Sequence, residues 1–353
     1  MTRRRPDHAR PNVTLATVAA AVGVSRMTVS NAYNRPDQLS PELRDRVFAV
    51  AAELGYSGPN PLAQTLSRGE TGSIGLVLDY PLTLALTDPA AQAFVHGVAA
   101  GTEERGLGLT LVPRIDGRHA ALVRAALVDG FVLYCVPEDD PRMDAVRGRR
   151  LPFVGVDFDP RPGLVRVNVD DRGAARSVAE HLTQLGHRRF GVVLGLEARA
   201  STGAGAEAAA TRHVERERLA GWREGLEAAG VDWGAVPVAA PPDKGVATGR
   251  AGGAQLLDRA DRPTAILALS DMIAMGVIEA ARERGISVPR QLSVTGFDDI
   301  AEAALTDPPL TTIRQPLELK GSEAVRLLLE GETAQSVLLP TELVVRASTS
   351  PAP

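Results

Sequence analysis

The residues from Thr14 to Asn34 read as two short helices separated at Gly23, and this stretch constrains the fold of the chain more than any other. Thr14 can cap the first helix, and its apolar stripe is Leu15, Val18, Ala19 and Val22. Gly23 suits a tight turn, and Ser25 can cap a second helix that runs to about Tyr33. Polar and extended side chains are left exposed at the start of that helix: Arg26, Met27, Thr28 and Asn31. Two helices joined in this way are typical of a helix-turn-helix.

A third helix is expected from Ser40 to Leu54, with serine as its cap, proline in its first turn and Gly55 at its end. Together the three helices predict a small headpiece of about sixty residues. The segment from Pro59 to Ser67 predicts one more helix of about two turns. Helices that short are marginal in water, so this one is expected to order only when something holds it.

Charge is distributed unevenly along the 353 residues. Residues 1–70 carry a formal charge of +3 and the remainder −7, for a total of −4. A basic start on an acidic body fits a DNA-binding end joined to a domain that does not touch DNA. Basic residues are 37 arginines and only two lysines, which we attribute to genome composition.

From Ser73 onward, apolar runs alternate with helical stretches. This alternation predicts parallel sheets covered by helices on both faces, and about ten strands favour two lobes over one wide sheet. The stretch from Glu197 to Ala210 is rich in small residues and is expected to be a loop. The expected strands are 74–78, 109–112, 131–136, 153–156, 190–194, 265–269 and 292–295. The expected helices are 89–105, 119–128, 171–185, 215–229, 249–259 and 271–284.

Several classes of protein are disfavoured. No apolar run approaches the ~18–20 residues of a membrane span, and no apolar run follows the basic N-terminus, so we expect a cytoplasmic protein without membrane contact. The single cysteine, Cys135, is expected to be a buried structural thiol. The glycines at 203–208 lie too far beyond their strand for a dinucleotide fingerprint. We find no catalytic constellation, metal-binding spacing or cofactor motif, and expect none of the three.

Several segments, taken together and in order, resemble the LacI family of transcriptional regulators. The resemblance covers nearly the whole chain and extends well beyond the helix-turn-helix. It implies a two-lobed effector domain like that of periplasmic sugar-binding proteins, with crossovers between lobes near Val167–Asp170 and Ile313–Pro316. The segments that carry it are VTLATVAAAVGVSRMTVSNAYN, SPELRDRVFAVAAELGY, NPLAQTLSRGETGSIG, GHRRFGVV, RLAGWREGLEAAG, SDMIAMGVIEAARERGISVP, LSVTGFDDI and PPLTTIRQP.

By this resemblance, two copies would place their second helices in successive major grooves of a pseudo-palindromic, double-stranded operator. Arg26 suits guanine, Asn31 suits adenine or phosphate, and Met27 can contact a thymine methyl group. Leu66 matches the leucine that relatives insert into the minor groove, although it could instead pack on the partner chain. The candidate DNA-binding residues are Thr14, Ser25, Arg26, Met27, Thr28, Asn31, Asn34 and Leu66.

A ligand is expected between the lobes, outside the C-terminal ends of the strands. Acids that accept from hydroxyls, with an arginine to donate, are what a sugar or polyol requires. Arg218 and Asp298 match the effector-binding arginine and aspartate of the family. Asp271 is as well suited to cap its helix as to contact the ligand. Lys244 stands where many relatives have an aromatic residue; it indicates either an acidic or phosphorylated effector or only a solvated loop. The candidate effector-binding residues are Asp79, Asp157, Arg218, Ser270, Asp298, Gln315 and Lys244.

The predicted organisation is a flexible basic tail (1–12), a helix-turn-helix headpiece (13–58), a hinge helix and linker (59–70), a two-lobed effector and dimerisation domain (71–346) and a tail (347–353). We expect a homodimeric regulator, acting as a repressor, whose operator affinity is controlled by a small-molecule effector such as a sugar. Binding would change lobe closure and order or melt the hinge helix. The alternative is a sugar-binding or transport protein without DNA regulation, and the direction of the effector response stays open.

Overall fold

The computed structural model describes residues 13–58, 69–115, 117–195, 202–242 and 245–353. The chain divides into two compact units, residues 1–71 and residues 72–353. The expected tail at 1–12, most of the expected hinge helix with Leu66, and Lys244 lie outside the described residues. No helix in the described part of the chain is long and apolar enough to cross a membrane.

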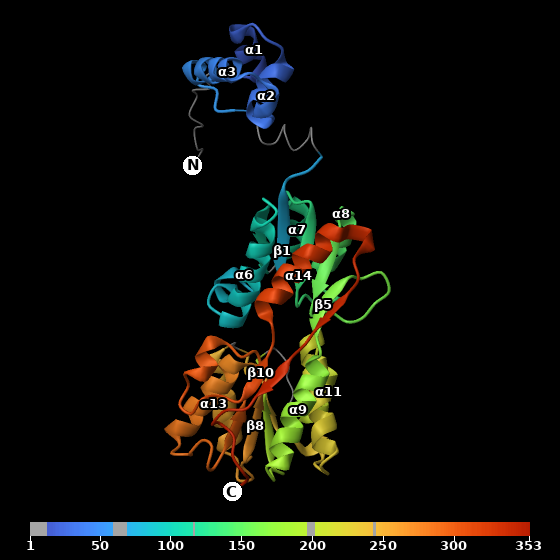
Figure 1. Ribbon diagram of the computed structural model, residues 1–353. Coiled ribbons are helices and arrows are strands. Elements are labelled where there is room, and N and C mark those ends of the chain that lie inside the picture. Colours follow the sequence, from blue (N-terminus) through green and yellow to red (C-terminus); the bar gives the residue numbers. More distant parts are fainter. Residues whose placement is uncertain (1–12, 59–68, 116, 196–201, 243–244) are drawn as a thin grey trace, which may run out of the picture. The chain divides into compact units, whose positions relative to one another are not determined.

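The first unit is a three-helix headpiece with a small apolar core (Figure 1). Thr14 caps the first helix and Ser25 the second, as predicted, and Gly23 adopts the left-handed φ of 75° that the turn requires. The buried core residues are Val18, Ala19, Val22, Val29, Ala32, Val47 and Ala51. The elements are α1 (Leu15–Val22), α2 (Arg26–Asn34), the single turn η1 (Pro36–Gln38) and α3 (Pro41–Leu54).

The second unit holds two parallel sheets, which form two lobes (Figure 1). The sheet of lobe 1 has the order β11-β5-β4-β3-β1-β2. Its strands are β1 (Ser73–Leu78), β2 (Gly108–Val112), β3 (Gly130–Tyr134), β4 (Phe153–Val156), β5 (Arg166–Val169) and β11 (Val337–Leu339). Its helices are α5 (Leu82–Ala85), α6 (Pro89–Glu103), α7 (His119–Ala125), α8 (Pro141–Arg149), α14 (Leu317–Glu330) and the turn η4 (Gly331–Thr333).

Side chains alternate between the two faces of this sheet. Ile74, Leu76 and Leu78 of β1 pack in one buried cluster with α6 and α14, whereas Val77 belongs to a second cluster with α7 and α8. A parallel sheet covered on both faces is what the near-continuous apolar runs predicted.

Lobe 2 has a four-stranded parallel sheet of order β7-β6-β8-β9. Its strands are β6 (Phe190–Val193), β7 (Val238–Ala239), β8 (Ala265–Ala268) and β9 (Ser293–Thr295), and a separate antiparallel pair is formed by β10 (Thr312–Arg314) and β12 (Glu342–Val344). Its helices are α9 (Asp171–Gln184), α10 (Gly203–Ala209), α11 (His213–Glu227), α12 (Val246–Leu257) and α13 (Asp271–Glu283), with the turns η2 (Trp233–Ala235) and η3 (Ala301–Ala304).

Three pairs of helices pack so closely that each contact needs a glycine. A Cβ atom on Gly97 of α6 would lie 1.9 Å from the Glu318 carbonyl oxygen at the start of α14. On Gly221 of α11 it would lie 2.2 Å from the Arg172 oxygen of α9, and on Gly249 of α12 it would lie 1.9 Å from an oxygen of α13. Glycine is therefore required at these positions by close helix packing and not by the geometry of a turn.

Within the described residues, the chain crosses between the lobes three times: between β5 and α9, between β10 and α14, and between β11 and β12. The first two crossovers lie where the sequence predicted them. The third, at residues 339–342, was missed because the strands on either side of it have only three residues each. The helices α8 and α14 were not predicted either.

The structure differs from three sequence expectations. The expected loop 197–210 contains α10, which Thr202 caps by accepting from the Gly205 amide at 3.3 Å. The strand expected at residues 131–136 ends at Tyr134, and Cys135, which follows it, is half-buried as a whole residue. Residues 347–353, predicted only as a tail, are anchored to lobe 2, because Ser348 is fully buried and accepts from the Thr311 amide at 2.8 Å.

Candidate functional site

The start of α2 presents two exposed side chains. Arg26 is exposed, and 69% of the surface of Met27 is accessible, an unusual exposure for a large apolar residue. Ser25 accepts from the Thr28 amide at 3.0 Å, which positions the first turn of the helix. This is the arrangement in which a recognition helix offers its N-terminal side chains to base edges.

The other candidate DNA-binding residues are held by the headpiece itself. Thr14 and Thr17 form a reciprocal capping box at the start of α1. Asn31 is half-buried and its Nδ2 donates to Gln38 Oε1 at 3.3 Å, and the Asn34 Nδ2 donates to the Ser30 hydroxyl at 3.2 Å. In this structure, therefore, Arg26 and Met27 are freer to reach a base than the two asparagines are.

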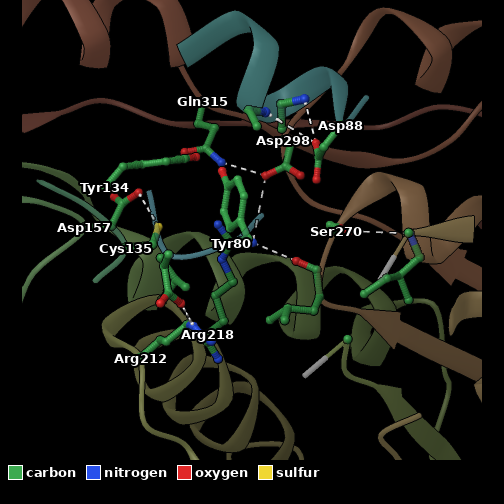
Figure 2. A pocket seen from close by; sticks show the side chains of 18 residues that line it. Tyr80, Asp88, Tyr134, Cys135, Asp157, Arg212, Arg218, Ser270, Asp298 and Gln315 are labelled. Atoms are coloured by element: carbon green, nitrogen blue, oxygen red, sulfur yellow. Dashed lines mark hydrogen bonds and ion pairs between the residues drawn. The ribbon is translucent and has the colours of Figure 1, made fainter. Parts of the chain in front are cut away.

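A cavity of about 150 Å³ lies between the two lobes of the second unit (Figure 2). Of the candidate effector-binding residues, Asp79, Asp157, Arg218, Ser270, Asp298 and Gln315 line it. Lys244 lies outside the described residues. The lining residues that the sequence reasoning missed include Tyr80, Asp88, Tyr134, Cys135, Arg212 and Val214.

Strand ends explain why these residues meet. Asp79 follows β1, Asp157 follows β4 and Ser270 follows β8, so each lies at the C-terminal edge of its sheet. In open parallel sheets this edge is where ligands bind. Asp157 and Asp298 also adopt positive φ angles of 61° and 126°, and strained backbone of this kind gathers at functional sites.

Asp79 is neutralised from both lobes. Arg142 of α8 donates from Nη2 to Asp79 Oδ1 at 2.6 Å, and Arg212, at the start of α11, donates from Nε to Oδ2 at 2.5 Å. Arg142 is held in turn by Asp140, and Arg212 by Glu215. Asp79 is almost fully buried, so these two arginines supply the charge compensation that a buried carboxylate requires.

Arg218 is fixed in one orientation on the wall of lobe 2. Its Nε donates to Asp171 Oδ1 at 2.8 Å and its Nη1 donates to the Leu269 carbonyl oxygen at 2.6 Å. The guanidinium carbon lies 3.5 Å from the centroid of the Phe297 ring. A donor held on two sides and stacked on a ring is preorganised, so less side-chain entropy is lost when a ligand binds.

Asp298 faces Arg218 at 3.9 Å and accepts from Gln315 Nε2 at 2.6 Å. Burial raises the pKa of Asp298 well above its usual value, the charge of Arg218 opposes this, and the nearby Asp271 adds to it. Burial likewise raises the pKa of the Cys135 thiol, with a further contribution from Asp157, so this cysteine is a poor nucleophile.

Asp271 does not line the cavity, and it is not the cap of its helix. Ser270 caps α13 by accepting from the Ile273 amide, and Ser270 also lines the cavity. Asp271 accepts from the Ile300 amide at 3.0 Å and from the Thr312 hydroxyl at 2.5 Å. These hydrogen bonds join α13 to the segment after β9, through Ile300, and to β10, through Thr312.

A helix-turn-helix headpiece and a two-lobed domain with a polar cavity define a DNA-binding regulator that carries a ligand-binding domain. Residues 14–60 match the bacterial regulatory proteins of the lacI family, and residues 179–349 match the periplasmic binding protein-like domain. The chain is 43% identical over 331 residues to the HTH-type transcriptional regulator Rv3575c of Mycobacterium tuberculosis, with 91% of each protein covered. It is 38% identical over 332 residues to the regulator IpsA of Corynebacterium glutamicum, with 90% of each covered.

Solved structures agree. A complex of the transcriptional regulator CelR with cellobiose is 31% identical, covers 96% of this chain and 100% of its own, and superposes with a TM-score of 0.70. The lac repressor dimer bound to operator and the anti-inducer ONPF is 29% identical, with 96% and 99% covered and a TM-score of 0.76. The chain therefore belongs to the LacI family of DNA-binding transcriptional regulators, whose members named here are regulators and not enzymes.

Proposed function

We propose that this regulator is a homodimeric repressor whose affinity for a pseudo-palindromic operator is set by a small, uncharged, polyhydroxylated effector in the cavity between the lobes. The observation that carries the proposal is the pairing of the lining carboxylates. Asp79 is bound by two arginines, Asp157 by Lys320, and Asp298 faces Arg218 and Gln315.

Paired carboxylates offer lone pairs without offering net charge. The lone pairs that these partners leave unused can accept from hydroxyl groups, while Arg218 donates, which is the pattern that a sugar or polyol requires. A phosphorylated or acidic ligand would need cations of its own, but the two lining arginines, Arg212 and Arg218, already pair with Asp79 and Asp171. The volume of about 150 Å³ is below the roughly 300–1,000 Å³ of drug-sized ligand sites, which favours a compact ligand.

The comparisons support a sugar as the ligand class, because the CelR complex contains cellobiose. They do not favour the alternative of a ligand-binding protein without DNA regulation, since the relatives that match over nine-tenths of the chain are transcriptional regulators. The headpiece supports the same choice through the exposed Arg26 and Met27 at the start of its second helix.

The test is selection of binding sites from a random DNA library by the purified protein at moderate salt, where non-specific contacts weaken. The selected sites are then titrated with D-glucose, D-galactose, sorbitol, cellobiose, D-glucuronate and glucose 6-phosphate. We expect one pseudo-palindromic site whose occupancy changes with an uncharged compound. If no specific site is selected, the proposal that the protein represses from a pseudo-palindromic operator is wrong. If only glucose 6-phosphate or glucuronate changes the occupancy, the proposal that the effector is uncharged is wrong.

A matched pair of variants separates DNA binding from effector binding. Asp298→Asn keeps a side chain that tolerates positive φ, and we expect it to retain the operator but lose the effector response. Asp258→Asn, which removes an exposed partner of Arg284 that does not line the cavity, should retain both. Gel filtration of the free and operator-bound protein tests the expected dimer.

A further inference from the structure

Lys320 occupies an unusual position for a charged side chain. It is one of two lysines beside 37 arginines, and only 1% of its surface is accessible. It lies in the first turn of α14, where the helix dipole disfavours a positive charge. A lysine that is both buried and placed against the dipole needs specific partners to be tolerated.

Its partners belong to the wall of the cavity. The Lys320 Nζ lies 2.6 Å from Asp157 Oδ1, donates to Asp157 Oδ2 at 2.8 Å, and donates to Gln315 Oε1 at 3.0 Å. Asp157 follows β4 in lobe 1, and Gln315 lies in the crossover between β10 and α14. Both residues line the cavity, whereas Lys320 stands behind them.

Gln315 continues this chain of hydrogen bonds into lobe 2. Its Nε2 donates to Asp298 Oδ1 at 2.6 Å, along the dashed line that joins the two residues in Figure 2. Because Asp298 follows β9, the series of contacts from Asp157 through Lys320 and Gln315 to Asp298 links the strand ends of the two sheets. We refer to these four residues as the interlobe relay.

Lys320 determines which way the Gln315 amide faces. An ammonium group has three donors and no acceptor, so only the amide oxygen can lie against it. The amide nitrogen is then turned toward Asp298, whether that carboxyl is ionised or protonated. If the amide were reversed, its NH₂ group would face the ammonium without an acceptor, and its oxygen would face the Asp298 carboxyl group.

We infer that Lys320 is a positioning residue that determines the specificity of the cavity: through the interlobe relay it neutralises Asp157 and holds Gln315 as a donor to Asp298, so that the ligand meets uncharged acceptor positions there. This inference rests on the proposed function of the cavity as an effector site, and it assigns the preference for hydroxyl donors to a residue that does not line the cavity. If Lys320 only neutralised Asp157, replacing it would change the effect of substituting Asp157 on stability. It would not change the effect of substituting Asp298, which it reaches through Gln315.

The test is a double-mutant cycle between Lys320→Met and Asp298→Asn in the full-length protein, read as thermal unfolding midpoints. Both substitutions are made in an Asp157→Asn background, so that loss of the lysine leaves no unpaired carboxylate, and where the lysine is kept the Gln315 oxygen remains as an acceptor. We expect the two midpoint shifts to depart from additivity by about 2 °C or more. With Gln315→Met added, the same cycle should become additive. A control cycle of Lys320→Met with Asp258→Asn should be additive throughout.

Additive shifts in the presence of Gln315, or a coupling that survives Gln315→Met, would overturn the inference. A second measurement needs no substitution: the side-chain amide protons of Gln315 should exchange at least tenfold more slowly than those of the exposed Gln335, and equal rates would also overturn it. Neither measurement uses DNA or effector. Their failure is therefore independent of a failure of the operator selection, which tests the proposed function.

Discussion

Asp271 makes the stability of the second unit depend on pH in a way that can be calculated. The side chain is fully buried at the start of α13. Burial raises its pKa from 3.8 to about 6, although hydrogen bonds from Thr312 and the Ile300 amide favour the ionised form and oppose the shift. The negative charge of Asp299 adds to the increase.

An acid whose pKa is higher in the folded than in the unfolded state favours folding at low pH. The folded protein binds more protons than the unfolded chain between about pH 4 and pH 6, so the contribution of Asp271 is fully present below about pH 4 and is lost as pH rises through about 6. A difference of about two pKa units corresponds to about 3 kcal/mol, of which about 1.4 kcal/mol is lost between roughly pH 5 and pH 8.

The perturbation is Asp271→Asn, which keeps the shape of the side chain and an acceptor for the Ile300 amide but cannot ionise. The assay is urea unfolding of both proteins at several pH values from about 5 to 8. We expect the free energy of unfolding of the variant to gain about 1.4 kcal/mol relative to the unsubstituted protein across this range. Titrating groups that do not interact with Asp271 cancel in the difference, whereas Asp298, whose pKa the charge of Asp271 raises, does not.

The control is Asp258→Asn. The hydrogen bond from Arg284 lowers the pKa of Asp258, so this carboxyl titrates below the range tested and its replacement should add no pH dependence. A free-energy difference between Asp271→Asn and the unsubstituted protein that stays constant from about pH 5 to pH 8 would refute the reasoning. It would mean that Asp271 is ionised throughout this range in the folded state.

Three further predictions concern packing and DNA recognition. Gly249→Ala should lower the free energy of unfolding by about 1–3 kcal/mol, because the new Cβ would meet the Ile273 oxygen. The control Gly148→Ala on α8 places a Cβ with nothing within 4 Å and should be neutral or stabilising. Equal urea midpoints for the two variants would contradict this prediction. Ser25→Ala should destabilise the headpiece by about 1 kcal/mol through loss of the cap on α2, seen as a lower headpiece transition in circular dichroism, and an unchanged transition would speak against the cap. Arg26→Ala should relax operator preference at one base pair by about 1–3 kcal/mol, measured by repeating the site selection, and an unchanged selected sequence would exclude base contact by this residue.

The sequence predicted the architecture because the relevant forces act over short distances along the chain. Caps at Thr14 and Ser25 and the turn at Gly23 involve neighbours within four residues, and the structure has all three as predicted. Apolar runs of strand length could bury only in a sheet that is covered on both faces. The third crossover and α10 were missed because short strands and small residues carry little periodic signal.

The candidate cavity residues could be named for a similar reason. Asp79, Asp157 and Ser270 each follow an apolar strand directly, and the ends of parallel strands meet at one edge. Asp298 follows a strand in the same way and also matches the LacI family, whereas Arg218 and Gln315 came from the resemblance to that family. The cations behind the wall had no such signal: Arg142 and Lys320 lie on helices, where a charged residue normally faces water.

By itself, then, the sequence determined the headpiece, the two parallel sheets and the edge at which a ligand would bind, since these follow from capping, periodicity and the direction of strands. Only the tertiary structure decided the electrostatics of that edge. Asp79 pairs with residues 63 and 133 positions away, and Lys320 lies 163 positions from Asp157. Ion pairs between such distant residues depend on how helices pack on the two lobes, and that packing alone turns a row of aspartates into a cavity whose charges are compensated.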